Sequence, residues 1–171
     1  MKKYKLTEET LEIDGHTLHR IVALRDFGEV KKGDLGGFIE KESNLAHDWN
    51  CWIYNDAVVR DDAMVYGEAE VHGNAKVYGK AKVYGKAKVH GNAEVYGDAI
   101  VEKKSDYIVF KNWWSSGRYF TWTRSNDMWS VGCFYGTGEE LIKKAYADSE
   151  EKGREYERIV KYVESIKSEI K

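Results

Sequence analysis

The chain has 171 residues, enough for one domain or two small ones. It carries 27 basic and 29 acidic residues, and its net charge of −2 gives no long-range attraction toward nucleic acid. No stretch resembles a transmembrane run or a signal peptide, so we expect a cytoplasmic protein without a membrane partner.

Residues 1–44 are expected to form an N-terminal β cap. Leu11–Leu18 places Asp14-Gly15 between short apolar runs, which is typical of a β-hairpin. His19–Arg25 continues as a strand, and Lys32-Gly-Asp-Leu-Gly-Gly-Phe-Ile-Glu leads into the next segment.

Residues 45–103 are dominated by a repeat with a period of six. Six consecutive hexads from Val65 to Ile100 have valine first, tyrosine or histidine second, glycine third and alanine fifth, and looser hexads open at Ile53 and Val59. A spacing of six does not give the apolar face of a helix. It fits a short strand followed by a turn, and three such units close a triangular coil with valine and alanine inside. The end of such a coil exposes unpaired backbone groups, so a cap is required.

The charged residues test which positions stack on one another in successive coils. Residues eighteen apart form five pairs of opposite sign, whereas a spacing of six would place lysines opposite each other, which is unfavourable. We therefore predict a parallel β-helix of nearly three coils. The charged pairs are Asp62/Lys80, Lys80/Asp98, Glu68/Lys86, Glu70/Lys88 and Lys76/Glu94, and the stacked rings are Tyr66/Tyr84, Tyr78/Tyr96 and His72/His90.

Residues 104–171 are expected to form a small C-terminal α+β module. Asp106–Lys111 is a predicted strand, and Arg118–Thr123 and Met128–Phe134 form a hairpin around Ser125–Asp127. Thr137 and Glu140 form a capping box at the start of one helix, and a second helix begins near Asp148 or Ser149. The apolar stripe of the second helix comprises Tyr156, Ile159, Val160, Val163, Ile166 and Ile170.

The motif around Lys32–Glu40, the Cys51-Trp-Ile-Tyr segment and the tandem Val-Tyr-Gly-x-Ala hexads resemble a family of phage and prophage hexapeptide-repeat proteins, often called transferase-like. The resemblance covers roughly the first 100 residues, and the segment from Gly132 to Glu140 resembles the C-terminal part of some of these proteins. It implies that the β-helix is left-handed and that the gene comes from a mobile element.

Hexapeptide β-helices include acyltransferases in which a histidine acts as general base between neighbouring subunits. His72 and His90 are the alternative catalytic candidates here, although the clean hexads lack the protruding loop of those enzymes, so no catalytic residue is expected. A zinc site would need a third histidine such as His47, and no metal is expected. Cys51 and Cys133 show no ligand spacing and are expected to be reduced thiols.

The C-terminal module is rich in aromatic residues, which could pack as a core, stack a nucleotide or anchor a protein partner. The predicted binding residues are Trp113, Trp114, Arg118, Tyr119, Trp122, Arg124 and Trp129. The flat tyrosine columns of the β-helix are the predicted oligomer interface, with Tyr66, Tyr78, Tyr84 and Tyr96.

From these features we expect a non-enzymatic, phage-derived binding or scaffold protein that forms a homo-oligomer, a dimer or a trimer, through its β-helix. It would act in the host cytoplasm as an anti-defence inhibitor, blocking or sequestering a host protein or a small nucleotide, with no cofactor and no nucleic-acid partner. Two alternatives stay open: an acyl-CoA-dependent acyltransferase or a degenerate relative of one, and a structural or assembly protein.

Overall fold

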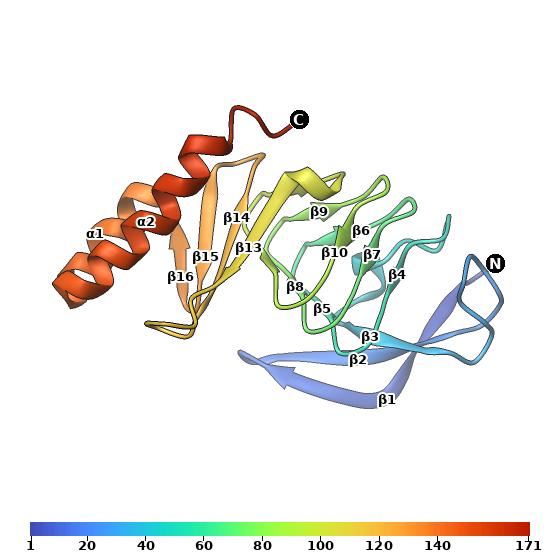
Figure 1. The fold of residues 1–171 in the computed structure, drawn as a ribbon. Coiled ribbons are helices and arrows are strands. Elements are labelled where there is room, and N and C mark those ends of the chain that lie inside the picture. Colours follow the sequence, from blue (N-terminus) through green and yellow to red (C-terminus); the bar gives the residue numbers. More distant parts are fainter. The chain divides into compact units, whose positions relative to one another are not determined.

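The structure is a computed structural model that describes residues 1–171 as two compact units, Met1–Lys104 and Ser105–Lys171. Figure 1 follows the elements along the chain, from the strands of the first unit to the two helices of the second. Neither helix combines the length and the apolar composition that a membrane crossing requires.

The first unit begins with a hairpin that continues into the coils. Strands β1 (Tyr4–Ile13) and β2 (His16–Ala23) are antiparallel, and Asp14 and Gly15 turn between them with φ angles of 52° and 82°. Strand β3 (Leu35–Ile39) pairs antiparallel with β2 on one side and parallel with β5 (Val58–Val59) on the other. The predicted hairpin is confirmed, and the parallel stacking begins at β3, within the segment expected to be cap.

The predicted parallel β-helix is confirmed. Its two-residue strands stack at a spacing of eighteen residues into three sheets, ordered β3-β5-β8-β11, β4-β7-β10 and β6-β9-β12. The sheet that contains β3 holds four stacked strands, so the solenoid has about four turns rather than nearly three. The strands are β4 (Trp52–Ile53), β5 (Val58–Val59), β6 (Met64–Val65), β7 (Glu70–Val71), β8 (Lys76–Val77), β9 (Lys82–Val83), β10 (Lys88–Val89), β11 (Glu94–Val95) and β12 (Ile100–Val101).

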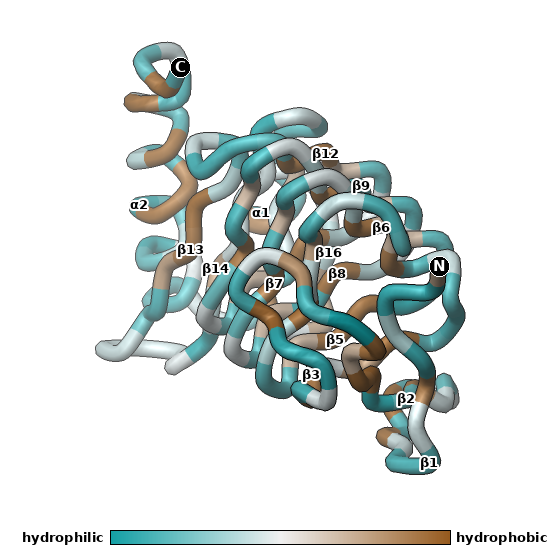
Figure 2. Tube along the Cα trace, turned by 90° about the vertical axis from the view of Figure 1, so that its right-hand side faces the viewer, coloured by the Kyte–Doolittle hydropathy of each residue, from teal (hydrophilic) through white to brown (hydrophobic).

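The interior of the coils is built from the first and fifth hexad positions. From Val65 to Ala99 every valine and alanine of the repeat is at most 1% exposed. Figure 2 shows these hydrophobic positions recurring from coil to coil among hydrophilic ones. Burying this continuous row of methyl groups is the main stabilising contribution to the first unit, since isolated two-residue strands have no stability of their own.

The third hexad position needs a left-handed backbone. Gly67 has φ of 71°, and a Cβ there would lie 3.1 Å from the backbone nitrogen of Gly85 in the next coil. Asn55 takes the same conformation in the first coil, with φ of 55°, and its Oδ1 accepts a hydrogen bond from Gly73 N–H at 3.2 Å. Asp61 takes it with φ of 56°, so short polar side chains replace glycine at these two positions, and Trp49 takes it with φ of 57° six residues before Asn55.

The side-chain ladders confirm the register. Lys88 Nζ lies 2.9 Å from Glu70 Oε2 and Lys76 Nζ lies 3.7 Å from Glu94 Oε1. The ring centroids are 4.9 Å apart for Tyr66 and Tyr84 and 4.3 Å apart for Tyr78 and Tyr96. These four tyrosines are half-buried rather than fully exposed.

The second unit is a four-stranded antiparallel sheet with two helices, as predicted. The strands β13 (Tyr107–Lys111), β14 (Tyr119–Thr123), β15 (Met128–Val131) and β16 (Phe134–Gly136) pair in chain order, followed by α1 (Gly138–Asp148) and α2 (Glu150–Ile166). The strand expected over Met128–Phe134 is divided in two, because Gly132 takes a φ of 58° and turns the chain. The predicted capping box is present, with Thr137 and Glu140 bonding each other's backbone N–H.

The core of the second unit lies between the sheet and the helices. Phe120, Trp122, Trp129 and Val131 come from the sheet, and Leu141, Ala145, Tyr156, Ile159, Val160 and Val163 come from the helices. The predicted stripe of α2 is thus buried at its first four positions and half-buried at Ile166, where the helix ends. Ile170 was expected on this stripe but lies beyond the helix, and it is half-buried.

Candidate functional site

The histidines of the repeat occupy one corner of the coils. His72 follows β7 and stacks on Tyr54 of the preceding coil, with ring centroids 4.3 Å apart and an angle of 2° between the rings. His90 follows β10 at the equivalent position one coil on, because Val71 pairs with Val89. We call Tyr54, His72 and His90 the histidine column. The structure therefore brings the two predicted alternative catalytic residues onto the same corner.

His72 is paired with a carboxylate. Its Nε2 lies 2.8 Å from Glu70 Oε2, and the same oxygen accepts a hydrogen bond from Lys88 Nζ at 2.9 Å. Because an ionised carboxylate only accepts, His72 Nε2 must carry the proton. In the neutral ring the lone pair is then on Nδ1, where it can take a proton from another molecule. The side chain of His72 is 33% exposed, so solvent has access to this residue.

Glu70 is held in its ionised form. Partial burial alone would raise the pKa of its carboxyl, but the hydrogen bonds from Lys88 and His72 outweigh burial and lower the pKa below its usual range. An ionised Glu70 orients the imidazole and would stabilise the positive charge that the ring gains when it takes up a proton. A histidine supported in this way has the arrangement of a general base.

A second histidine–carboxylate cluster, which the sequence reading missed, joins the hairpin to the coils. His16 Nδ1 lies 2.9 Å from Glu40 Oε1, and its Nε2 lies 3.6 Å from Asp61 Oδ1. The hydrogen bond from His16 holds the pKa of Glu40 below its usual range, against the opposing effect of partial burial. The Asp-Gly turn located His16 in the sequence, but nothing in the spacing pointed to its partners.

The chemistry of this second cluster differs from that of His72. His16, Glu40 and Asp61 have ligand atoms within 4.8 Å of one another, as a metal site would require. However, Glu40 Oε2 already accepts Asp61 N–H at 2.6 Å and Asp61 Oδ2 accepts Gly79 N–H at 2.9 Å. Both ring nitrogens of His16 face carboxylates, so no lone pair is available to a substrate. We interpret the cluster as a structural contact that holds the hairpin against the coils.

His47, considered as a third metal ligand, packs elsewhere. Its ring stacks on Tyr4 of β1 with centroids 4.3 Å apart, and its Nδ1 accepts Lys3 N–H at 3.2 Å. Burial lowers the pKa of His47, so the neutral ring is favoured. The first coil therefore uses this histidine in packing against the hairpin.

The predicted binding residues of the second unit have different environments. Trp122 and Trp129 are 1% and 2% exposed and form part of the core, so their ring faces are not an open surface. Trp113 and Trp114 are 76% and 65% exposed on the turn after β13. Tyr119 is the first residue of β14, and Lys111 Nζ lies 4.1 Å from the centre of its ring. Arg118 and Arg124 lie on either side of β14: Arg124 is 3.8 Å from Asp106, and Arg118 lines a cavity beside the helices.

These features define the chain as a hexapeptide-repeat β-solenoid with a histidine–carboxylate pair on its surface. No family model matches the sequence. A search of curated proteins finds similarity to the "Uncharacterized acetyltransferase YdcK" of Escherichia coli (strain K12), with 39% identity over 67 residues. The match covers 34% of this chain and spans about a fifth (21%) of the length of that relative.

This match corrects the prediction that the protein is not an enzyme. The relative is named as an acetyltransferase, and the finding therefore points toward transferase chemistry, which the sequence reading had placed second. The hydrogen bond between His72 and Glu70 is a feature that the spacing of the hexads did not indicate.

Proposed function

We propose that this protein transfers an acyl group from a thioester donor to a hydroxyl or amine acceptor. The observation that carries the proposal is the hydrogen bond between His72 Nε2 and Glu70 Oε2, in a chain that is similar over 67 residues to a protein named as an acetyltransferase. A substrate thioester of the acyl-CoA kind is the donor.

In the proposed reaction His72 acts as general base. Its Nδ1 takes the proton of the acceptor, whose oxygen or nitrogen forms the new bond to the acyl carbon as the bond to the thiolate breaks. Glu70 holds the ring in the required tautomer and stabilises the imidazolium. The proton is then available to the leaving thiolate, so the ring returns to its starting state.

We also propose that a second copy of the chain covers the histidine column. Every hexad from Val65 to Ile100 has six residues, so no loop of the repeat itself rises above His72. The half-buried tyrosine columns with Tyr66 and Tyr78 offer the flat surface for such an association. Sedimentation of the purified protein should give a dimer or trimer, and a monomer at assay concentrations would contradict this part of the proposal.

The phage origin of the gene remains a prediction from resemblance, as does the block or sequestration of a host component. No comparison bears on either, and neither is needed for the proposed reaction.

The experiment is a thiol-release assay with acetyl-CoA and a panel of amino sugars, amino acids and alcohols. The wild-type chain should release thiol in an acceptor-dependent manner. His16→Asn is the matched control, because it removes a histidine–carboxylate pair that has no available lone pair; it should weaken folding but keep the rate per folded molecule. Calorimetry showing that acetyl-CoA does not bind would refute the proposal.

A further inference from the structure

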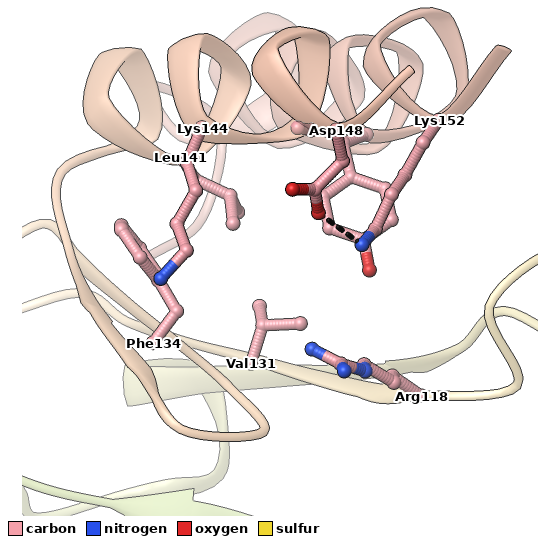
Figure 3. Close-up of a pocket in the computed structure, with 9 residues that line it drawn as sticks. Arg118, Val131, Phe134, Leu141, Lys144, Asp148 and Lys152 are labelled. Atoms are coloured by element: carbon pink, nitrogen blue, oxygen red, sulfur yellow. Dashed lines mark hydrogen bonds and ion pairs between the residues drawn. The ribbon is translucent and has the colours of Figure 1, made fainter.

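The second unit contains a cavity between its sheet and its helices (Figure 3). Arg118, which directly precedes β14, and Val131 of β15 approach it from the side of the sheet, and Lys144, Asp148 and Lys152 approach it from the helices. The enclosed part of the cavity has a volume of about 20 Å³, room for about one water molecule, so a larger anion would lie at its mouth beside the charged side chains. We call it the cationic cavity, and its apolar lining residues are Val131, Phe134, Leu141 and Ala145.

The charges around the cationic cavity are unbalanced. Arg118, Lys144 and Lys152 contribute three positive charges, and Asp148 is the one acid among the lining residues. Asp148 bonds Lys152, and the pKa of its carboxyl lies below the usual range because of that bond and of the charges on Lys152, Lys144 and Arg118. Asp148 is therefore ionised, and the four side chains keep a net charge of +2, which matches a dianion such as a phosphate monoester.

A hydroxyl group in the wall of this cavity has no partner. Tyr156 is 3% exposed, and its OH makes no hydrogen bond in the structure. An unsatisfied buried donor costs free energy, and buried hydroxyls are normally bonded. The phenolic O–H can donate to an anion, so a dianion that reaches it when the mouth of the cavity opens would satisfy the hydroxyl and the three cations together.

A second cavity adjoins the first, since Arg118 and Lys152 line both. Its other residues are Trp114, Ser115, Ser116, Ser149 and Glu151. Trp114 presents an indole that is 65% exposed and is held by a hydrogen bond from its Nε1 to Glu155 Oε2 at 2.5 Å. A fixed aromatic face beside three serine hydroxyls and a carboxylate suits a base and a ribose.

We propose that the two adjoining cavities form one site for a nucleoside 5′-monophosphate. The phosphate binds Arg118 and Lys144 and accepts a hydrogen bond from the hydroxyl of Tyr156. The base stacks on Trp114, and the ribose contacts the serines. Lys152 lines both cavities, and its ammonium group binds the phosphate in place of the Asp148 carboxylate. This site is separate from the histidine column in sequence and in chemistry, and it stands whether or not acyl transfer is found.

Calorimetric titration of the full chain with AMP, GMP, CMP and UMP tests the proposal. At least one of the four should bind, and adenosine or the matching nucleoside should bind at least about tenfold more weakly, because the charged hydrogen bonds are lost. Binding should also weaken from pH 7.5 to pH 5.5 as the phosphate takes up its second proton. If none of the four binds, the proposal is overturned, and inorganic phosphate binding as tightly as the nucleotide overturns its nucleoside part.

Charge variants give effects of opposite sign. Arg118→Gln should reduce the affinity about tenfold or more, and Lys144→Gln should reduce it severalfold. Lys143→Gln is the matched control, because Lys143 is an exposed neighbour on the same helix and does not line either cavity; its affinity should change less than about twofold. Asp148→Asn removes the carboxylate that competes with the phosphate for Lys152, so it should tighten nucleotide binding. Equal losses in the Lys143 and Lys144 variants would show only a general charge effect and overturn the site.

Tyr156→Phe separates a binding hydroxyl from a structural one. Removing an unpartnered buried hydroxyl should raise the melting temperature of the free protein by a few degrees, since the phenyl ring keeps its packing. The same change should weaken nucleotide binding about tenfold. A variant that melts at a lower temperature, or that binds the nucleotide as tightly as the wild type, contradicts the role given to this hydroxyl.

Discussion

Glu70 Oε2 accepts hydrogen bonds from two directions, from His72 in its own coil at 2.8 Å and from Lys88 in the next coil at 2.9 Å. The stacking of the coils therefore fixes the catalytic candidate as well as the fold. A shift of register would remove Lys88 and leave Glu70 without the charge that keeps it ionised.

The first prediction concerns the pH dependence of this pair. The folded-state pKa of Glu70 is lowered, so its contribution to the free energy of unfolding is present above the ordinary value and is lost as the pH falls through the lower, folded-state value. At pH 7 Glu70→Gln should cost at most about 1 kcal/mol, because the pair is partly exposed. Urea unfolding at pH 7 and pH 3 checks this: the difference between wild type and variant should shrink in acid, and a difference that grows would contradict it.

The second prediction compares two glycines with similar backbones. Gly79 and Gly91 have φ angles of 72° and 66°, but a Cβ at Gly79 would lie 3.0 Å from Gly97 N, whereas a Cβ at Gly91 meets nothing within 4 Å. Both alanine variants should lose about 1–2 kcal/mol from the left-handed backbone. Gly79→Ala should lose roughly 1–3 kcal/mol more because the next coil must move. Thermal or urea unfolding measures the difference, and equal losses would mean that the coils do not approach this closely.

The third prediction concerns the two thiols, which are both free. Cys133 is exposed, while Cys51 is fully buried with its Sγ 3.2 Å from Lys3 Nζ. Burial raises the pKa of the Cys51 thiol, although the charge of Lys3 opposes this. In the native protein a thiol reagent should label Cys133 quickly and Cys51 only after unfolding. The Cys133→Ser variant isolates the slow reaction, and rapid labelling of that variant would show that the hairpin does not seal the first coil.

Much of the first unit could be predicted because its repeat constrains every sixth residue. The opposite charges of residues such as Glu70 and Lys88 indicated that residues eighteen apart stack, and that spacing predicted the stacked tyrosines. The first coil was harder, because Asn55 and Asp61 take the left-handed conformation in place of glycine and so break the pattern. The start of the stacking at β3 was missed for a related reason: Phe38 and Ile39 carry no hexad motif, yet they pair with Val58 and Val59.

The site was only partly predictable. Spacing placed His72 and His90 on one corner, but the bond to Glu70 depends on a side-chain direction that the period of six does not specify. In the second unit, alternation along the strands could not tell whether Trp122 faced the helices or a ligand. The cationic cavity joins Arg118 to Lys144 and Lys152 across the sheet–helix contact, and residues so distant in sequence carry no common motif.

The most direct test of the proposed function is the rate of thiol release from acetyl-CoA by the wild-type and His72→Asn chains, measured side by side with the acceptor that supports the fastest wild-type reaction. Loss of the general base should lower kcat by about 100-fold or more while the KM for acetyl-CoA and the unfolding midpoint change little. A folded His72→Asn chain that releases thiol at the wild-type rate would contradict the assignment.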